Sequence, residues 1–362
     1  MKRFFSLLLT LLILLTASSC TQQIASPTTA VEETTTVSKL PAGNLAVHFI
    51  DVGQGDCTLL ESDGEFVLID AGESEYGERV LSYMGGHGAS ELKYVIATHP
   101  HADHVGGLST VINNVVTENF ITVETDCATK TWRKVLTAVD NQNVNYIDAE
   151  VGDTYSFGSA RFTIMAPLSD DYSGYNSYSV TTKVECGEIS FMLTGDAEKD
   201  SEYEMVASGE ALSADVLKCG HHGSSTSTTA KFLKAVNPAY AIISCGENNE
   251  YGHPHRETMQ KLNTLGCEIY RTDTMGTIIA TTDGKNLTFS TDKTENSSYT
   301  YSAGEQAHSP SPDGYIGNKN SRIFHNPACN SVEAMSEKNK VNFKTRQDAA
   351  NAGYTPCANC NP

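Results

Sequence analysis

A six-residue segment, His-Pro-His-Ala-Asp-His, concentrates three imidazoles and one carboxylate. Its candidate metal ligands are His99, His101, Asp103 and His104. Imidazole and carboxylate are groups that zinc and other divalent transition metals accept. The spacing suits two ions, with His99 and His101 on one ion and Asp103 and His104 on the other. An apolar stretch precedes the segment and Gly106-Gly107 follows it, which lets a helix begin close by. We therefore favour a metal centre over an incidental surface cluster.

Two other apolar stretches end in residues of the same kinds. FMLTGD ends at Asp196, whose carboxylate could bridge two ions, although an Asp at a strand end is often only a turn former. ADVLKCGHHGS leads to adjacent His221 and His222. After the first motif, both segments become candidates for the same centre.

These motifs need a scaffold, and the pattern of short apolar runs and helical segments predicts a mixed, sheet-rich α/β domain. Strands are expected at 45–52, 57–62, 65–70, 93–99, 118–124, 160–166, 180–186, 189–194, 214–218, 239–244, 267–271 and 276–281. Helices are expected at 76–86, 106–114, 129–140, 198–208, 228–236 and 256–265.

Length and charge limit the possible functions. The chain has 362 residues, enough for two domains, and 39% of them are hydrophobic, which favours a folded protein. Lys and Arg number 25 against 44 Asp and Glu, a formal net charge of −19. So acidic a protein is a poor general binder of polyanions. A nucleic-acid role would need a local basic surface or a metal site.

The motifs HPHADH, LTGD and KCGHHGS, with FIDVGQGDCTLLES and FVLIDAG, resemble the metallo-β-lactamase superfamily. FIDVGQGD and HHGS are similar to its ComEC-like branch, and the resemblance covers residues 45–290. It implies an αββα sandwich with metals at one edge between two sheets. It also implies hydrolysis, with phosphodiesters as the leading substrates.

The resemblance also implies residue roles. The residues of the first motif would be metal ligands, and Asp196 would bridge the two ions. His221 would be the last ligand, and His222 would contact the substrate or hold a ligand in place. Asp51 and Asp70 would hydrogen-bond a ligand histidine. His253 and His255 would line the pocket and contact a leaving group or phosphate; a surface loop before a helix is the alternative.

The sequence departs from the superfamily because residues 105–195 contain no histidine. Asn176 and Ser177 are expected near the missing position. A site richer in oxygen would move preference toward manganese, so we expect one or two divalent ions, zinc or manganese. Water bound to such an ion becomes hydroxide near pH about 7, and Asp103 could orient it.

The N-terminus reads as an export signal. Residues 1–20 combine Lys2 and Arg3 with an apolar run and small residues before Cys20. This order resembles a bacterial lipoprotein processing site, with Cys20 as the lipid anchor; an ordinary signal peptide is the alternative. Residues 21–43 would be a flexible tether on the outer face of the membrane.

A second, smaller domain is expected at the C-terminus. Residues 44–290 would form the hydrolase domain, 291–314 a linker, and 315–362 a small α+β domain. A domain this short needs a disulfide or a bound metal ion for stability. Four residues suit a tetrahedral structural zinc site: His325, Cys329, Cys357 and Cys360. A disulfide within the C-x-x-C pair is the alternative.

The C-terminal segment resembles the metal-binding domain of Ada-type DNA-repair proteins. There a cysteine accepts a methyl group; here His325 takes that place, so we expect no methyl transfer. Residues 313–362 carry six Lys and Arg against four Asp and Glu, which favours DNA docking only weakly over a protein-interaction role.

The combined hypothesis is a surface-anchored, metal-dependent phosphodiesterase or nuclease acting on extracellular DNA. A hydrolase of a cell-wall phosphodiester, phosphocholine or lactone, or a non-catalytic binding protein, is the alternative. The six cysteines scattered through the large domain are expected to be single, buried and in strands.

Overall fold

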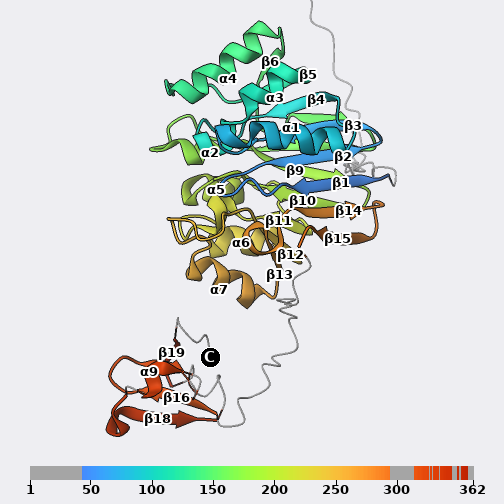
Figure 1. Cartoon of the computed structure of the whole chain (residues 1–362). Helices are drawn as coiled ribbons and strands as arrows, with labels where there is room; N and C mark the ends of the chain where they lie inside the picture. The colour runs from blue at the N-terminus through green and yellow to red at the C-terminus, as the bar shows by residue number, and fades with distance from the viewer. Residues whose placement is uncertain are drawn as a thin grey trace, which may run out of the picture. The chain divides into compact units, whose positions relative to one another are not determined.

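The computed structural model describes residues 43–293 and, with gaps, 314–357. The larger part holds two facing β-sheets (Figure 1). The first has the order β15-β14-β1-β2-β3-β4-β5-β6, and its strands from β3 to β6 run parallel. Its strands are β1 (Leu45–Phe49), β2 (Thr58–Ser62), β3 (Glu65–Ile69), β4 (Glu91–Ile96), β5 (Val116–Thr122), β6 (Asn145–Asp148), β14 (Ile278–Thr282) and β15 (Leu287–Thr291).

The second sheet has the order β13-β12-β11-β10-β9-β8-β7, and β10 to β13 run parallel. Its strands are β7 (Thr154–Phe157), β8 (Ala160–Ala166), β9 (Thr181–Cys186), β10 (Ile189–Leu193), β11 (Val216–Lys218), β12 (Tyr240–Ile243) and β13 (Glu268–Arg271). The apolar faces of the two sheets meet in one core, with Phe49 from the first against Phe162 and Phe191 from the second.

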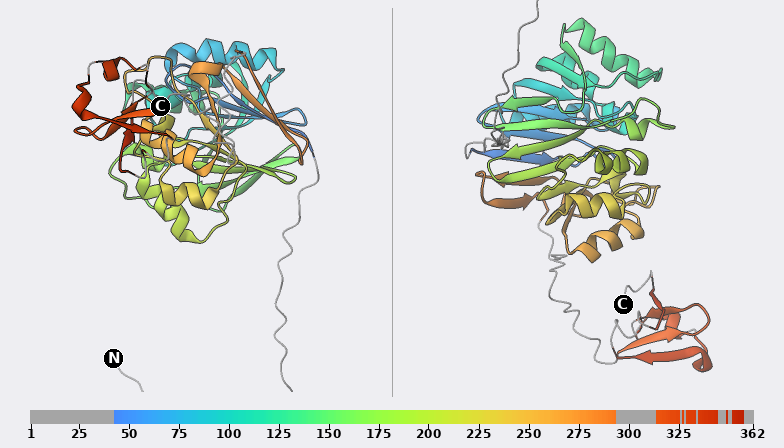
Figure 2. Two further views of the ribbon diagram at one scale, coloured as in Figure 1. Left: turned by 90° about the horizontal axis from the view of Figure 1, so that it is seen from below. Right: turned by 180° about the vertical axis from the view of Figure 1, so that it is seen from behind.

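Helices cover the outer face of each sheet, so the expected αββα sandwich is confirmed (Figure 2). On the first sheet lie α1 (Gly77–Gly86), α3 (Leu108–Asn114) and α4 (Lys130–Asn141); on the second lie α5 (Lys199–Ser208), α6 (Ala230–Val236) and α7 (Arg256–Leu265). Two one-turn helices, α2 (Ala102–Val105) and α8 (Thr272–Met275), complete the set.

In the larger part, three strands were not predicted: β6, β7 and β15. Each lies at an edge of its sheet, and most of its residues are exposed or half-buried. An edge strand with one solvated face carries little of the apolar signal by which a buried strand is recognised.

The scattered cysteines are single and buried as predicted, but only Cys186 lies in a strand, at the end of β9; the others lie in loops or just outside a strand. All six are buried and none forms a disulfide with another described residue; they are Cys57, Cys127, Cys186, Cys219, Cys245 and Cys267.

The described residues near the C-terminus form a third, four-stranded sheet with one short helix, the expected α+β arrangement. Its elements are β16 (Tyr315–Asn318), β17 (Ile323–His325), α9 (Asn330–Glu333), β18 (Lys340–Phe343) and β19 (Thr355–Pro356). Tyr315, Phe324 and Tyr354 form its small core. The expected signal peptide, the expected lipid anchor Cys20 and the expected zinc ligand Cys360 lie outside the described residues. Among the described helices, none is long and apolar enough to cross a membrane.

Candidate metal centre

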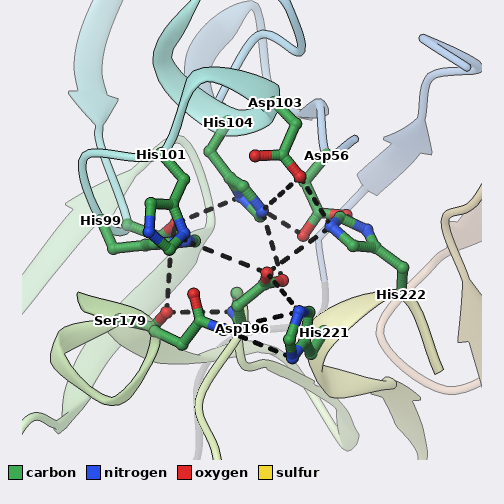
Figure 3. Close-up of polar contacts among 12 residues, drawn as sticks. Asp56, His99, His101, Asp103, His104, Ser179, Asp196, His221 and His222 are labelled. Carbon is green, nitrogen blue, oxygen red and sulfur yellow. Dashed lines mark hydrogen bonds and ion pairs between the residues drawn. The ribbon is translucent and has the colours of Figure 1, made fainter. Parts of the chain in front are cut away.

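The polar motifs meet at the edge where parallel strands of both sheets end. The loop after β4 supplies His99 and leads into α2, the loop after β10 supplies Asp196, and the turn after β11 supplies His222. The carboxyl ends of neighbouring parallel strands lie at one edge of a sheet, so residues far apart in sequence converge there. Figure 3 shows Asp196 in the middle of this group.

The carboxylate of Asp196 faces four imidazoles. Its Oδ1 lies 3.2 Å from Nε2 of His104, and its Oδ2 lies 3.5 Å from Nε2 of His222 and 3.9 Å from Nε2 of His99. The same Oδ2 lies 3.8 Å from Nε2 of His221. The side chain of Asp196 is 2% exposed. Asp196 therefore has the position of a residue shared between two groups of ligands.

The first group is the pair His99 and His101, whose Nε2 and Nδ1 atoms lie 3.0 Å apart. On its other side, Nδ1 of His99 faces the Oγ of Ser179 at 3.3 Å. That hydroxyl also accepts a hydrogen bond from the backbone N–H of Asp196. We expected Asn176 and Ser177 near this pair. Asn176 forms a side-chain hydrogen bond with His101 and also lies 3.3 Å from Nδ1 of His221. The hydroxyl that contacts His99 is that of Ser179, which we had not selected.

The second group contains His222 rather than His221. Nε2 of His222 lies 3.1 Å from Oδ2 of Asp103, and the side chain is 2% exposed. Its Nδ1 lies 3.0 Å from the backbone oxygen of Ser244, to which it can donate. Asp56, His104, Asp196 and His222 each offer an atom within 4.8 Å of all the others.

The side chain of His221 is 25% exposed and is held at the rim, where its Nδ1 contacts Glu198 and Thr226, both at 3.1 Å. Both histidines have left-handed backbone φ angles, 50° and 53°. Nε2 of His221 also faces Oδ2 of Asp196, at 3.8 Å, but His222 is buried and faces Asp103 as well. This geometry favours His222 as the ligand, against our preference for His221.

Asp56, which sequence reasoning did not select, lies beneath the centre. Its Oδ1 is 3.3 Å from Nδ1 of His222, and its Oδ2 forms a buried ion pair with Nζ of Lys218. Its backbone N–H donates to the carbonyl of Asp103 at 3.1 Å. The only sequence signal was its place in FIDVGQGD, where we considered Asp51 instead.

Of the two aspartates that we expected to hydrogen-bond a ligand histidine, in the described part of the chain Asp70 does so and Asp51 does not. Oδ2 of Asp70 lies 2.8 Å from Nδ1 of His104 and also accepts from the hydroxyl of Thr98. Asp51 caps its own loop by accepting from Gly53 N–H and contacts no ligand histidine among the described residues.

The carboxylates set the protonation of these histidines. Burial lowers the pKa of His222, but the charge of Asp196 and the hydrogen bond with Asp103 outweigh it and raise the pKa to about 10. Burial also disfavours the charged form of His104, yet Asp196, Asp103 and Asp70 raise its pKa well above the ordinary value. For His99 burial wins, together with the charge of His104, and its pKa falls well below the ordinary value.

The residues fit divalent metal ions. Nε2 of His104 and Oδ1 of Asp196 are buried and make no hydrogen bond with any described group, although they lie 3.2 Å apart. Buried polar atoms seldom stay without a partner. Nitrogen and oxygen atoms converging in this way suit an ion that accepts both.

The two histidines that we expected to line the pocket, His253 and His255, lie in different environments. His253 is buried, its Nδ1 lies 3.4 Å from the amide nitrogen of Gln54, and its ring centroid lies 5.5 Å from that of His221. Burial, with the charges of His222 and His221, lowers its pKa to about 4. His255 lies farther out and accepts from the backbone N–H of Ser225 at 2.9 Å.

A second ligand cluster lies in the small sheet. His325, Cys329 and Cys357 offer ligand atoms within 4.8 Å of one another. Nδ1 of His325 is buried without a hydrogen-bond partner among the described residues. One histidine and two cysteines fit zinc.

Comparison with known proteins agrees with both sites. The model of the metallo-beta-lactamase superfamily matches residues 50–247, and the model of the metal binding domain of Ada matches residues 303–362. The fold and the site thus define a metal-dependent hydrolase, and the chain belongs to the metallo-beta-lactamase superfamily.

The curated relatives place this chain in the ComEC-like branch of the metallo-beta-lactamase superfamily. ComE operon protein 3 of Bacillus subtilis is 33% identical over 256 residues, covering 64% of this chain and 32% of that protein. Recombination protein 2 of Haemophilus influenzae is 31% identical over 237 residues, covering 64% and 28%. The chain thus spans about a third of the length of these relatives. Among solved structures, the metallo-beta-lactamase fold protein YhfI from Bacillus subtilis has 16% identity and a TM-score of 0.42, covering 63% of this chain and 96% of that one.

Proposed function

We propose that this chain is a phosphodiesterase that cleaves DNA outside the cell membrane. The observation that carries the proposal is Asp196, whose carboxylate lies between two groups of candidate ligands. Phosphodiester cleavage is the chemistry for which a paired-ion site of this kind is well suited. Relatives named for competence and recombination favour DNA as the substrate.

We assign the ligands from their positions. His99, His101 and Asp196 would hold one ion; Asp103, His104, His222 and Asp196 would hold the other. Such ions supply an activated water and neutralise charge on the phosphate.

The chain's own residues position and exchange protons around these ligands. Oδ2 of Asp103 lies at the site while its backbone carbonyl is tied to Asp56, so the carboxylate is placed to orient a water. The rings of the partly exposed His221 and of His253 lie 5.5 Å apart beside the centre, where they would contact the phosphate or the leaving group. With a pKa of about 4, His253 is neutral at pH 7 and able to donate from one ring nitrogen and accept at the other.

The remaining parts of the chain would place this site. Residues 1–20 would direct export and leave Cys20 lipid-modified on the outer face of a bacterial membrane, and 21–43 would be the tether. Beyond the hydrolase domain of 44–290 and the linker of 291–314, the zinc-stapled domain of 315–362 would help to dock DNA. His325, Cys329, Cys357 and Cys360 would hold its zinc.

The test uses residues 21–362 with zinc or manganese, and single-stranded DNA, double-stranded DNA and bis(p-nitrophenyl) phosphate as substrates. Asp196→Asn, which keeps the side-chain shape, is the control. We expect DNA cleavage that the substitution abolishes. Cleavage of the small diester alone would contradict a nuclease and favour a cell-wall or lipid phosphodiester. Undiminished turnover in the folded variant would contradict the metal site itself.

A further inference from the structure

A basic stripe runs along the solvent face of α4. Lys130, Arg133 and Lys134 are exposed and stand three and four residues apart, so they lie on one face of the helix. Trp132 and Val135 on the opposite face are buried against the first sheet. The packing of α4 therefore fixes which way the three cations point.

The basic stripe lines an open pocket of about 390 Å³ between α3 and α4. Neutral polar side chains complete its wall: Ser109, Asn113, Thr137 and Asn141. The lining contains no carboxylate. In a chain with 44 Asp and Glu against 25 Lys and Arg, a pocket lined by three cations and no acid is unusual.

The three cations are not neutralised locally. None of them forms an ion pair with a described residue, whereas Lys93 is 2.6 Å from Glu65 and Arg161 is 3.0 Å from Glu185. Like charges three or four residues apart on a helix repel one another and destabilise it. An anion in the pocket would remove this repulsion and find hydroxyl and amide groups to bond.

The pocket lies in elements that adjoin the metal centre. Helix α2, which carries Asp103 and His104, packs against α4. The segment just before α4 holds Asp126, which accepts a hydrogen bond of 2.8 Å from the hydroxyl of Tyr175. The ring of Tyr175 lies 6.0 Å from that of His101. A chain of contacts thus connects the N-terminal end of the basic stripe with the first ligand pair.

We propose that the pocket between α3 and α4 is a phosphate subsite that holds a nucleic-acid strand away from the bond being cleaved. The inference rests on the proposed function, because it takes a nucleic acid as the substrate. It supplies the local basic surface that so acidic a protein needs in order to bind a polyanion. A small diester, which has no second phosphate, would gain nothing from the subsite.

The test replaces all three cations, Lys130→Gln, Arg133→Gln and Lys134→Gln, in the full chain. Binding of a 20-nucleotide single strand is measured against salt concentration in the Asp196→Asn background, and turnover of bis(p-nitrophenyl) phosphate is measured with Asp196 intact. We expect about tenfold weaker binding and a slope of log affinity against log salt that is smaller by about 2, since each phosphate contact contributes about 0.7. Turnover of the small diester should not change.

The matched control is Lys231→Gln, Lys234→Gln and Lys285→Gln, which removes the same charge from exposed positions elsewhere. An equal loss of binding in this control would show a long-range charge effect and overturn the subsite. Unchanged oligonucleotide binding in the α4 variant would also overturn the subsite. If that variant instead lost binding to phosphatidylglycerol vesicles, the pocket would be a membrane contact and the nucleic-acid subsite would again be overturned. Failure of the wild type to cleave any diester would refute the proposed function, but the binding comparison would still decide the subsite.

Discussion

Lys218 and Asp56 form an ion pair at the floor of the metal centre, with side chains only 2% and 4% exposed. Burial lowers the pKa of Lys218, but the charges of Asp56 and Asp196 outweigh it and raise the pKa. The ammonium therefore remains charged, and it balances one of the carboxylates gathered beneath His222. Nζ also donates to the backbone oxygen of Cys219 at 3.2 Å, which ties the pair to the end of β11.

Lys218→Met should destabilise the protein by about 3–5 kcal/mol, because it leaves the buried carboxylate of Asp56 without its partner. Chemical denaturation of the metal-free protein measures this. Asp56→Asn added to Lys218→Met should recover part of the loss, since it removes the unpaired charge. No recovery in the double variant would show that Lys218 acts through packing alone.

Asp70→Asn should lower metal affinity by about 10- to 100-fold while the fold persists, since Asp70 orients His104 through a 2.8 Å contact with Nδ1. Competition with a chromogenic chelator gives the affinity, and circular dichroism checks the fold. Asp51→Asn is the control, because Asp51 contacts the loop and no ligand histidine among the described residues. Equal losses in both variants would contradict a specific role for Asp70.

His222→Ala should remove one of two bound ions, whereas His221→Ala should leave the stoichiometry unchanged and weaken substrate binding. The reason is that His222 lies against Asp103 and Asp196, and His221 is held at the rim by Glu198. Metal analysis after gel filtration measures the ratio. The reverse result would restore our sequence-based preference.

The chelated protein should lose stability as the pH rises toward 10. The pKa of His222 is raised from the ordinary 6.5 to about 10, so its charged form stabilises the fold fully below pH 6.5, and this stabilisation disappears as the pH passes through 10. Unfolding free energies in chelator at pH 6.5, 8 and 10 should fall more steeply for the wild type than for His222→Asn. Parallel curves would contradict the coupling between His222 and its carboxylates.

One equivalent of zinc should remain with the small domain after the hydrolase site has been emptied, because cysteine ligands bind it tightly. His325→Ala should release this zinc, and His325→Cys should retain it. Zinc release monitored with a colorimetric chelator measures both. Loss of the metal in the cysteine variant as well would argue that the histidine is specifically required.

Local spacing explains what the sequence could predict about the site. His99, His101, Asp103 and His104 lie within six positions, so one loop brings them together whatever the rest of the chain does. Asp196 and the paired histidines follow buried strands, which run parallel and end side by side. The mixed α/β class followed from the same buried strands, whereas the αββα sandwich was implied by the resemblance to the superfamily.

Long-range packing explains what could not be predicted. Asp56 matters because it meets Lys218 from the other sheet, and Ser179 matters because β9 passes beside His99. The choice between His221 and His222 depends on two left-handed backbone angles and on Glu198. None of these contacts and backbone angles can be recognised from the local sequence.

The six unpaired cysteines have a chemical consequence of their own. Burial raises the pKa of Cys219 and of Cys245 to about 12, and that of Cys267 to about 11. Thiol exchange and oxidation proceed through the thiolate, which these residues scarcely form at neutral pH. Reducing agents should therefore not weaken the described part of the hydrolase domain, which holds no disulfide, and peroxide should leave Cys219, Cys245 and Cys267 unmodified.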